Sequence, residues 1–341
     1  MRLFSTEQIS KYHPDKFADQ ISDAILTECL RQDPSSHCGI ETMVKDTTVV
    51  LGGEITTSAV IDYEAIVASV ANKLSYDVTK AINLIGQQSP QINGAVSSVE
   101  DIGAGDQGIM FGYATSETDS FLPFGFDLAN KIIKVIEDDV ENNPDTILKG
   151  DTKCQVTVDL DNPGYVNEVL ISACHKEGYT LDVVCSYIKN LVDHLANPEK
   201  WTINPAGIWT LGGAHADCGL TGRKIVCDQY GGYCAVGGGA FSGKDPSKVD
   251  RSATYMARQI AIDMVKQHDL KWCEVQLAYA IGVAEPVSVN VKNDKNINLA
   301  DEVKAKYNLT PKGIINHLNL LNVNYEKMAE GCHFYNWPLF A

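Results

Sequence analysis

The most recognisable motif in this sequence is a glycine-rich string that ends in a lysine. Residues 238–244 read GGAFSGK, which fits the G-x-x-x-x-G-K part of a phosphate-binding loop. Glycines let backbone amides approach a polyanion, and Lys244 and Lys248 add positive charge. Asp245, however, stands where a Walker-type loop needs a serine or threonine hydroxyl to hold magnesium. The string predicts a phosphate contact; a tight turn carrying two solvated lysines is the alternative.

Three further strings combine charged side chains with glycines or with a helix start. Residues 13–16 read HPDK, which places an imidazole, a carboxylate and an ammonium together, a set that suits phosphate and magnesium. Residues 103–108 read GAGDQG, and residues 217–224 read DCGLTGRK. Each string alone would equally fit a turn or a capped surface helix. Their combination favours a polyphosphate site.

The charge of the chain supports a small anionic ligand rather than a large one. The sequence has 44 acidic and 28 basic residues and a formal net charge of −16, which argues against nucleic acid or anionic membranes as partners. Residues 221–251 are an exception, with five basic and three acidic side chains. Such a cationic island among glycines suits a compact polyanion such as a polyphosphate.

The sequence pattern predicts about three units of sheet and helix to position these residues, and hence an α+β fold. Proline and aspartate at a first turn indicate a helix from Pro14 to near Asp33. Further helices are expected through residues 66–74, 128–136 and 181–191, from residue 246, and last from Thr310. Strands are expected at residues 39–44, 48–56, 155–159, 166–175, 273–279 and 287–291. Residues 87–108 are expected to form a long loop that acts as a lid.

Two features bear on the cellular location. The start of the chain lacks a secretory signal, and the longest apolar run, residues 277–284, is too short to span a bilayer. Ten cysteines are scattered without a C-x-x-C pair, which indicates reduced and mostly buried thiols. We therefore expect a cytoplasmic protein with no membrane partner.

These strings, together with GGEITT at residues 52–57, QSP at 88–90 and YAIGVAEP at 279–286, resemble the signature blocks of S-adenosylmethionine synthetases. They occur in the order of that family and extend from residue 3 to about residue 333. The resemblance implies three intertwined α+β domains, at about residues 1–100, 101–211 and 212–341. It also implies a homodimer with shared active sites, often paired into a tetramer.

The implied activity is transfer of the adenosyl group of ATP to the sulfur of L-methionine, giving S-adenosylmethionine, diphosphate and phosphate. Position by position, the resemblance assigns ATP contacts to His13, Asp151, Thr152, Lys153, Ile208, Trp209, Asp217, Arg223, Lys224, Ala240 and Lys244. It assigns methionine contacts to Glu54, Gln88, Asp106, Asp217 and Lys248. It assigns a pair of Mg²⁺ ions to Asp15 and Asp250, and K⁺ to Glu41. The catalytic residues would be His13, Lys153, Arg223 and Lys244.

The chemistry of these side chains agrees with that reaction. A thioether sulfur is already a nucleophile, so its attack on the ribose C5′ needs alignment and a stabilised leaving group rather than a general base. The cationic residues would stabilise the departing tripolyphosphate, and His13 could donate a hydrogen bond to its leaving oxygen. Carboxylates such as Asp106 and Asp217 suit the positively charged sulfonium product.

Several positions depart from the family pattern. Lys11 and Tyr12 replace a usual Glu-Gly, Ile208 replaces a common arginine, and Val236 replaces a common histidine. Two alternative functions therefore stay open: a P-loop type of NTPase, and a non-catalytic paralogue that only binds. The retained group of like-charged residues favours the enzyme, because keeping them together is costly without a polyanion to bind.

Overall fold

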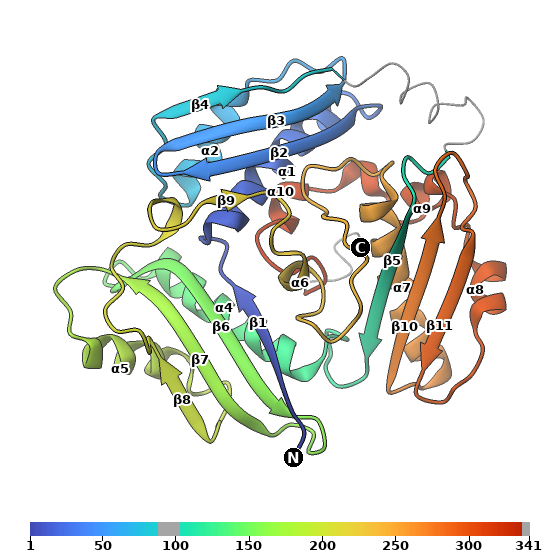
Figure 1. Ribbon diagram of the computed structural model, residues 1–341. Helices are drawn as coiled ribbons and strands as arrows, with labels where there is room; N and C mark the ends of the chain where they lie inside the picture. The colour runs from blue at the N-terminus through green and yellow to red at the C-terminus, as the bar shows by residue number, and fades with distance from the viewer. Residues whose placement is uncertain (88–102, 336–341) are drawn as a thin grey trace.

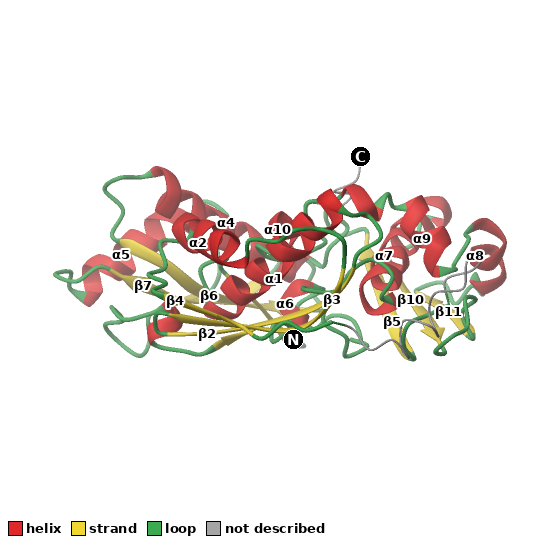
Figure 2. Cartoon of the chain, turned by 90° about the horizontal axis from the view of Figure 1, so that it is seen from above, coloured by secondary structure: helices red, strands yellow, loops and turns green. Residues whose placement is uncertain are grey.

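The computed structural model describes residues 1–87 and 103–335, which form three β-sheets with helices packed against them. Figure 2 shows most of the helices on one side of the molecule and the strands of the sheets on the other. The expected α+β fold of three similar units is confirmed. Buried apolar side chains form two clusters, one under the first and third sheets and one under the second sheet.

The first sheet contains the hairpin of β2 (His37–Lys45) and β3 (Thr48–Thr56), with the order β4-β3-β2-β9. Strand β4 (Lys80–Asn83) runs parallel to β3, and the short strand β9 (Gly219–Leu220) pairs with β2 from a distant part of the chain. The helices α1 (Pro14–Gln32) and α2 (Tyr63–Lys73) pack beside this sheet, as Figure 1 shows. The hairpin and α2 lie where the sequence pattern predicted them.

Helix α1 (Pro14–Gln32) begins and ends as its sequence predicts. Proline occupies the first turn, and the Nδ1 atom of His13 accepts a hydrogen bond from the Asp15 N–H at 3.1 Å, which caps the helix. The helix ends before Asp33, whose N–H donates to the Cys29 carbonyl. Most of its residues are buried, including several charged ones. A helix buried on nearly all sides must satisfy those charges internally, which becomes important for the site.

The second sheet has the order β1-β6-β7-β8. It combines β1 (Leu3–Ile9) with β6 (Leu148–Asp159), β7 (Val166–His175) and β8 (Lys200–Ile203). Two helices lie beside this sheet, α4 (Phe124–Asn142) and α5 (Leu181–Val192). The pattern predicted α4, α5, β7 and the end of β6, but neither β1 nor β8.

The third sheet has the order β11-β10-β5 and combines β10 (Trp272–Tyr279) and β11 (Ser288–Asn293) with β5 (Gly108–Thr115). Its long helix α7 (Val249–His268) starts three residues later than the expected position 246. Two shorter helices follow, α8 (Ala300–Lys306) and α9 (Pro311–His317). Thr310 caps α9 as predicted, through a 3.0 Å hydrogen bond from the Gly313 N–H. The expectation that this helix is the last was wrong, because α10 (Tyr325–Met328) follows.

The three sheets exchange strands along the chain, so the units are intertwined. The N-terminal strand β1 pairs with β6, more than 140 residues away, and β5 pairs with β10. Strand β9 similarly returns to the first sheet. The expected long loop overlaps residues 88–102, so its main part and the proposed lid lie outside the described residues.

The cysteines agree with the expectation of reduced and mostly buried thiols. All ten cysteines are free, and all but Cys185 and Cys218 are buried. In the described part of the chain, no helix is both long enough and apolar enough to cross a membrane.

A pH-dependent prediction arises at Glu137 on α4. This carboxyl accepts a 2.7 Å hydrogen bond from the Lys11 N–H, and burial raises its pKa to about 7. Because the unfolded carboxyl ionises near 4.5, folding is progressively disfavoured as the pH rises from 4.5 to 7. Glu137→Gln keeps an acceptor oxygen without the charge, so we expect it to raise the free energy of unfolding at pH 8 by up to about 3 kcal/mol.

Urea unfolding of both proteins at pH 8 and pH 5 measures this difference. At pH 5 the gain should be several-fold smaller, because the wild-type carboxyl is then protonated in the folded state. An equal gain at both values of pH would mean that ionisation of Glu137 is not the cause.

Candidate active site

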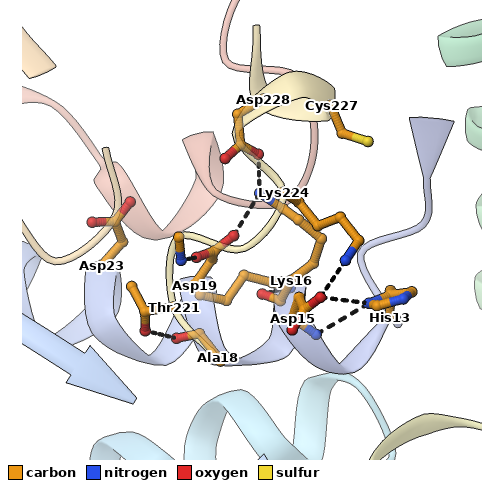
Figure 3. A network of polar contacts seen from close by, with 12 residues as sticks. His13, Asp15, Lys16, Ala18, Asp19, Asp23, Thr221, Lys224, Cys227 and Asp228 are labelled. Carbon is orange, nitrogen blue, oxygen red and sulfur yellow. Dashed lines mark hydrogen bonds and ion pairs between the residues drawn. The ribbon is translucent and has the colours of Figure 1, made fainter. Parts of the chain in front are cut away.

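His13 and Asp15 are buried at the start of α1 and belong to the polar cluster drawn in Figure 3. Burial, followed by the charges of Lys224 and Lys153, holds the pKa of His13 well below its usual range, so the imidazole is neutral. Its Nδ1 atom accepts the Asp15 N–H, which leaves the proton on Nε2. His13 is therefore a hydrogen-bond donor through Nε2.

Asp15 is the anchor for the basic end of the loop at residues 217–224. Its carboxylate accepts the Leu220 N–H at 2.9 Å and contacts the Lys224 ammonium, and the Arg223 Nε atom lies 4.0 Å away. Burial opposes ionisation of Asp15, but the hydrogen bonds from Lys224 and Leu220 outweigh it and hold its pKa below the usual range. Asp15 is thus an ionised carboxylate paired with two cations.

Strand β6 adds Asp151, Thr152 and Lys153 beside this cluster. Asp151 is buried, and its Oδ2 atom accepts the Gly213 N–H at 2.7 Å. Its Oδ1 atom and the Thr152 hydroxyl have no hydrogen-bond partner among the described residues. Burial raises the pKa of Asp151 to about 6, against the opposing effects of the Gly213 N–H and Lys153. The negative charge of Asp217 also raises this pKa, which places that exposed carboxylate nearby.

A second group of charged residues lies around the glycine-rich segment that contains Lys244. The Lys244 ammonium pairs with Asp250 at 2.5 Å, and the Lys248 ammonium with buried Asp245 at 2.6 Å. On the first sheet, Lys244 forms a bridge with Gly39 of β2. A Cβ atom at Gly39 would be 3.8 Å from the carboxylate of Glu54 and 3.9 Å from Cε of Lys248. The residues assigned to methionine on β3 and before α7 therefore lie close together.

The two groups meet where their glycine-containing loops touch. A Cβ atom at Gly222 would lie only 2.5 Å from Cβ of Ala240, so the 217–224 loop packs directly on the 238–244 segment. Glu41 on β2 lies near the second group. Its partial burial raises its pKa, Lys244 opposes this, and the charges of Asp19 and Glu54 add to it. The structure thus gathers side chains from all three predicted domains.

The segment around Lys244 does not have the geometry of a Walker loop. No strand leads into residues 238–244 in the described chain, and α7 begins only at Val249. Asp245, the residue that breaks the motif, accepts the Cys38 N–H at 2.8 Å and ties the segment to β2. The structure therefore disfavours a P-loop NTPase.

Three domain models of the S-adenosylmethionine synthetase family match the chain in succession: the N-terminal domain over residues 1–100, the central domain over 101–209 and the C-terminal domain over 211–339. The chain is also similar to a solved structure described as an unusual S-adenosylmethionine synthetase from Campylobacter jejuni, with a TM-score of 0.88. The two are 32% identical, and the match covers 97% of this chain and 94% of that chain.

The chain belongs to the S-adenosylmethionine synthetase family.

The two unusual residues before His13 are accommodated by their surroundings. The Lys11 ammonium pairs with Glu141, so its charge is neutralised. The Tyr12 ring is buried against Gly150, where a Cβ atom would lie 2.5 Å from the ring, and its carbonyl accepts the Tyr76 hydroxyl at 2.7 Å. The added bulk therefore packs into the fold beside His13.

The remaining assigned positions are exposed, half-buried or outside the described residues. Ile208 is exposed, whereas Trp209 is half-buried, and its backbone N–H donates to Nε2 of His175 at 3.2 Å. Asp106 is exposed, and its Oδ1 atom accepts the Gln107 N–H at 2.7 Å. Gln88 lies outside the described residues.

Two acids that hold the loops, Asp19 and Asp23, were not predicted from the sequence. Asp19 and Asp23 follow Asp15 at four-residue intervals on α1, and both are fully buried. Their partners include two loop glycines and Arg251, to which no role was assigned. The four-residue spacing of acids in a helix otherwise rich in apolar residues was the available signal.

Proposed function

We propose that the protein transfers the adenosyl group of ATP to the sulfur of L-methionine and forms S-adenosylmethionine, diphosphate and phosphate. The observation that carries this proposal is the cluster at the start of α1. There, a neutral histidine donor and an ionised aspartate lie among Lys153, Arg223 and Lys224, in a chain that belongs to the synthetase family. Such a cluster suits a polyphosphate leaving group.

The residues would act mainly on that leaving group. As the methionine sulfur bonds to C5′, the C5′–O bond breaks and negative charge builds on the tripolyphosphate. Fixed cations pre-arranged around that charge lower the barrier, because they need not reorganise during the reaction. The Nε2–H of His13 could donate to the oxygen that leaves C5′. No proton has to be removed from the thioether.

Other parts of the proposed site suit the nucleotide and methionine. The unpartnered Oδ1 atom of Asp151 could accept a hydrogen bond from a hydroxyl or amino group of ATP, which would remove the cost of leaving it buried and unsatisfied. Glu54 and Lys248 carry opposite charges at one place on the first sheet, which suits the ammonium and carboxylate of an amino acid. We retain Gln88 and Asp106 as proposed methionine contacts, and Trp209 and Ile208 as proposed ATP contacts.

The donor set fits magnesium bound together with a polyphosphate. No group of three or more His, Cys, Asp or Glu side chains is placed to enclose a metal among residues 1–87 and 103–335. Mg²⁺ commonly uses one or two carboxylates plus substrate phosphates, which Asp15 and Asp250 could provide. When bound, it would neutralise part of the charge of the triphosphate. K⁺ is proposed at Glu41, which lies near the carboxylates of Asp19 and Glu54 as well as the Lys244 ammonium.

We further propose a homodimer, possibly extended to a tetramer in solution by pairing of dimers. Along β2, the buried Ile40 and Thr42 alternate with the exposed Glu41 and Met43, so the latter two lie on the strand face opposite α1. A proposed site residue therefore lies on a surface with an exposed large apolar side chain. A second copy on this face would place proposed site residues of the two chains at one interface.

Product analysis tests the proposed reaction. We expect the protein, incubated with ATP, methionine, Mg²⁺ and K⁺, to form S-adenosylmethionine with equal amounts of phosphate and diphosphate. Release of ADP would instead indicate an NTPase or kinase. Calorimetric binding of ATP without any turnover would indicate a non-catalytic paralogue. Analytical ultracentrifugation of the same preparation tests the dimer, and a monomer at assay concentration would contradict it.

A further inference from the structure

Three aspartates on one face of α1 hold the two loops that carry the cations of the site. Asp15, Asp19 and Asp23 are spaced by four residues, so they lie one above the next on the helix, and all three are fully buried. Figure 3 shows them in succession along the helix, beside Thr221 and Lys224 of the 217–224 loop. Buried carboxylates that repel one another are unfavourable unless each is fully paired, so their partners are informative.

Asp19 binds the first loop through the backbone of Gly222. Its Oδ1 atom accepts the Gly222 N–H at 2.8 Å, and its Oδ2 atom accepts the Lys16 ammonium at 3.1 Å. The same ammonium also donates to Asp228 at 2.7 Å. One residue earlier in the loop, the Thr221 hydroxyl lies 2.8 Å from the Ser22 hydroxyl of α1. The loop is therefore tied to the helix at two successive residues.

Asp23 binds the second loop in the same way, one turn further along the helix. Its Oδ1 atom accepts the Gly243 N–H at 2.8 Å, and Arg251 donates to both carboxylate oxygens, at 2.7 and 2.6 Å. The Arg251 guanidinium also donates to the Lys244 carbonyl at 3.0 Å. The helix, the loop and α7 thus meet at one buried ion pair.

The two anchors share a pattern in sequence and in backbone conformation. In each loop the anchored N–H belongs to the glycine directly before a cation, Gly222 before Arg223 and Gly243 before Lys244. Both glycines have positive φ, 74° and 81°, a conformation that lies outside regular helix and strand geometry. In each loop, a carboxylate from α1 thus holds the backbone N–H of the residue directly before the cation.

We propose that Asp19 and Asp23 are positioning residues for polyphosphate binding. Asp19 orients Arg223 and Lys224 through Gly222, and Asp23 orients Lys244 through Gly243. Neither acts on the substrate directly. Helix α1 also carries His13 and Asp15 at its start. It would therefore fix the positions of these cations relative to one another. This inference rests on the proposed function, because it takes the polyphosphate chain as the ligand of these cations.

Asp19 gives the cleaner test, because Lys16 keeps Asp228 as a partner when Asp19 is changed. Asp19→Ala removes the acceptor of the Gly222 N–H, and Asp19→Asn keeps an acceptor oxygen. Asp228→Asn is the matched control: Asp228 is equally buried and shares Lys16, but it does not bind the Gly222 N–H. The measurements are calorimetric binding of inorganic tripolyphosphate and steady-state kinetics for ATP and methionine.

We expect Asp19→Ala to weaken tripolyphosphate binding about tenfold and to lower kcat/KM for ATP by a similar factor, with KM for methionine unchanged. Asp19→Asn should recover most of the loss, and Asp228→Asn should stay within about twofold of wild type. Wild-type affinity in Asp19→Ala, or an equal loss in Asp228→Asn, would overturn the proposal. If the wild type makes no S-adenosylmethionine, the proposed reaction fails, whereas the tripolyphosphate comparison still tests the positioning role.

Hydrogen exchange of the wild-type protein provides a measurement that needs no variant to fold. If the anchors hold, the Gly222 and Gly243 amides should exchange as slowly as the amides of α1, although both lie outside helices and strands. Exchange at the rate of open loop amides would mean that the carboxylates do not fix these peptides, and the proposal would be wrong.

Discussion

Replacing Lys244 with methionine is expected to lower kcat for S-adenosylmethionine synthesis by about 10²–10³-fold. Methionine has similar length and no charge, so the change removes one cation that would stabilise the leaving tripolyphosphate. The fold should survive, because the Lys244–Asp250 pair is partly exposed and Asp250 can be solvated once unpaired. Steady-state kinetics and a thermal melt of the same protein measure both expectations.

Lys200→Met is the matched control for this change. The Lys200 ammonium also pairs with a carboxylate, Glu168 at 2.8 Å, but it lies on β8, an element to which no site residue is assigned. Its kcat should equal that of wild type. If Lys244→Met keeps wild-type turnover, the lysine has no part in the reaction. If it melts far below wild type, a lower kcat says nothing about catalysis.

Replacing Arg251 with methionine is expected to lower the free energy of unfolding by about 3–5 kcal/mol. Arg251 is fully buried, binds both oxygens of Asp23 and donates to the Lys244 carbonyl and the Tyr255 hydroxyl. Its guanidinium also lies 4.2 Å from the centre of the Tyr325 ring. Its removal would leave the Asp23 carboxylate buried without its countercharge, which is the main source of the loss. Chemical denaturation measures it.

Arg31→Met provides the comparison with an exposed ion pair. Arg31 binds Glu28 at 2.6 Å on the solvent side of α1, and its removal should leave the unfolding transition unchanged. The double change Arg251→Met with Asp23→Leu should recover part of the stability, because both buried charges are then gone. A single Arg251→Met variant as stable as wild type would contradict the burial argument.

Much of the local structure was readable from the chain. The start of α1 at Pro14, the β2–β3 hairpin and the Thr310 cap depend on residues that are neighbours in sequence, and each lies where it was expected. The sequence also predicted a charged cluster, and the structure brings His13, Asp15, Arg223 and Lys224 together at the start of α1. Their catalytic roles stay predictions.

The sequence does not reveal which segments far apart in the chain pair with each other. Strand β1 has the alternation of a strand, but it is completed by β6, and β5 is completed by β10. Their backbone hydrogen bonds join residues with no sequence relation, so no local pattern names the partner.

The same limit applies to Asp19 and Asp23. From the sequence alone, Asp19 and Asp23 look like acids on a solvated helix face. Only the packing of two loops against α1 buries them and pairs them with loop amides. Sequence settles what depends on near neighbours: helix limits, caps, turn glycines and the kinds of charge available. The tertiary structure decides which of those charges are removed from water and what must pair with them, because burial is a property of the whole packed chain.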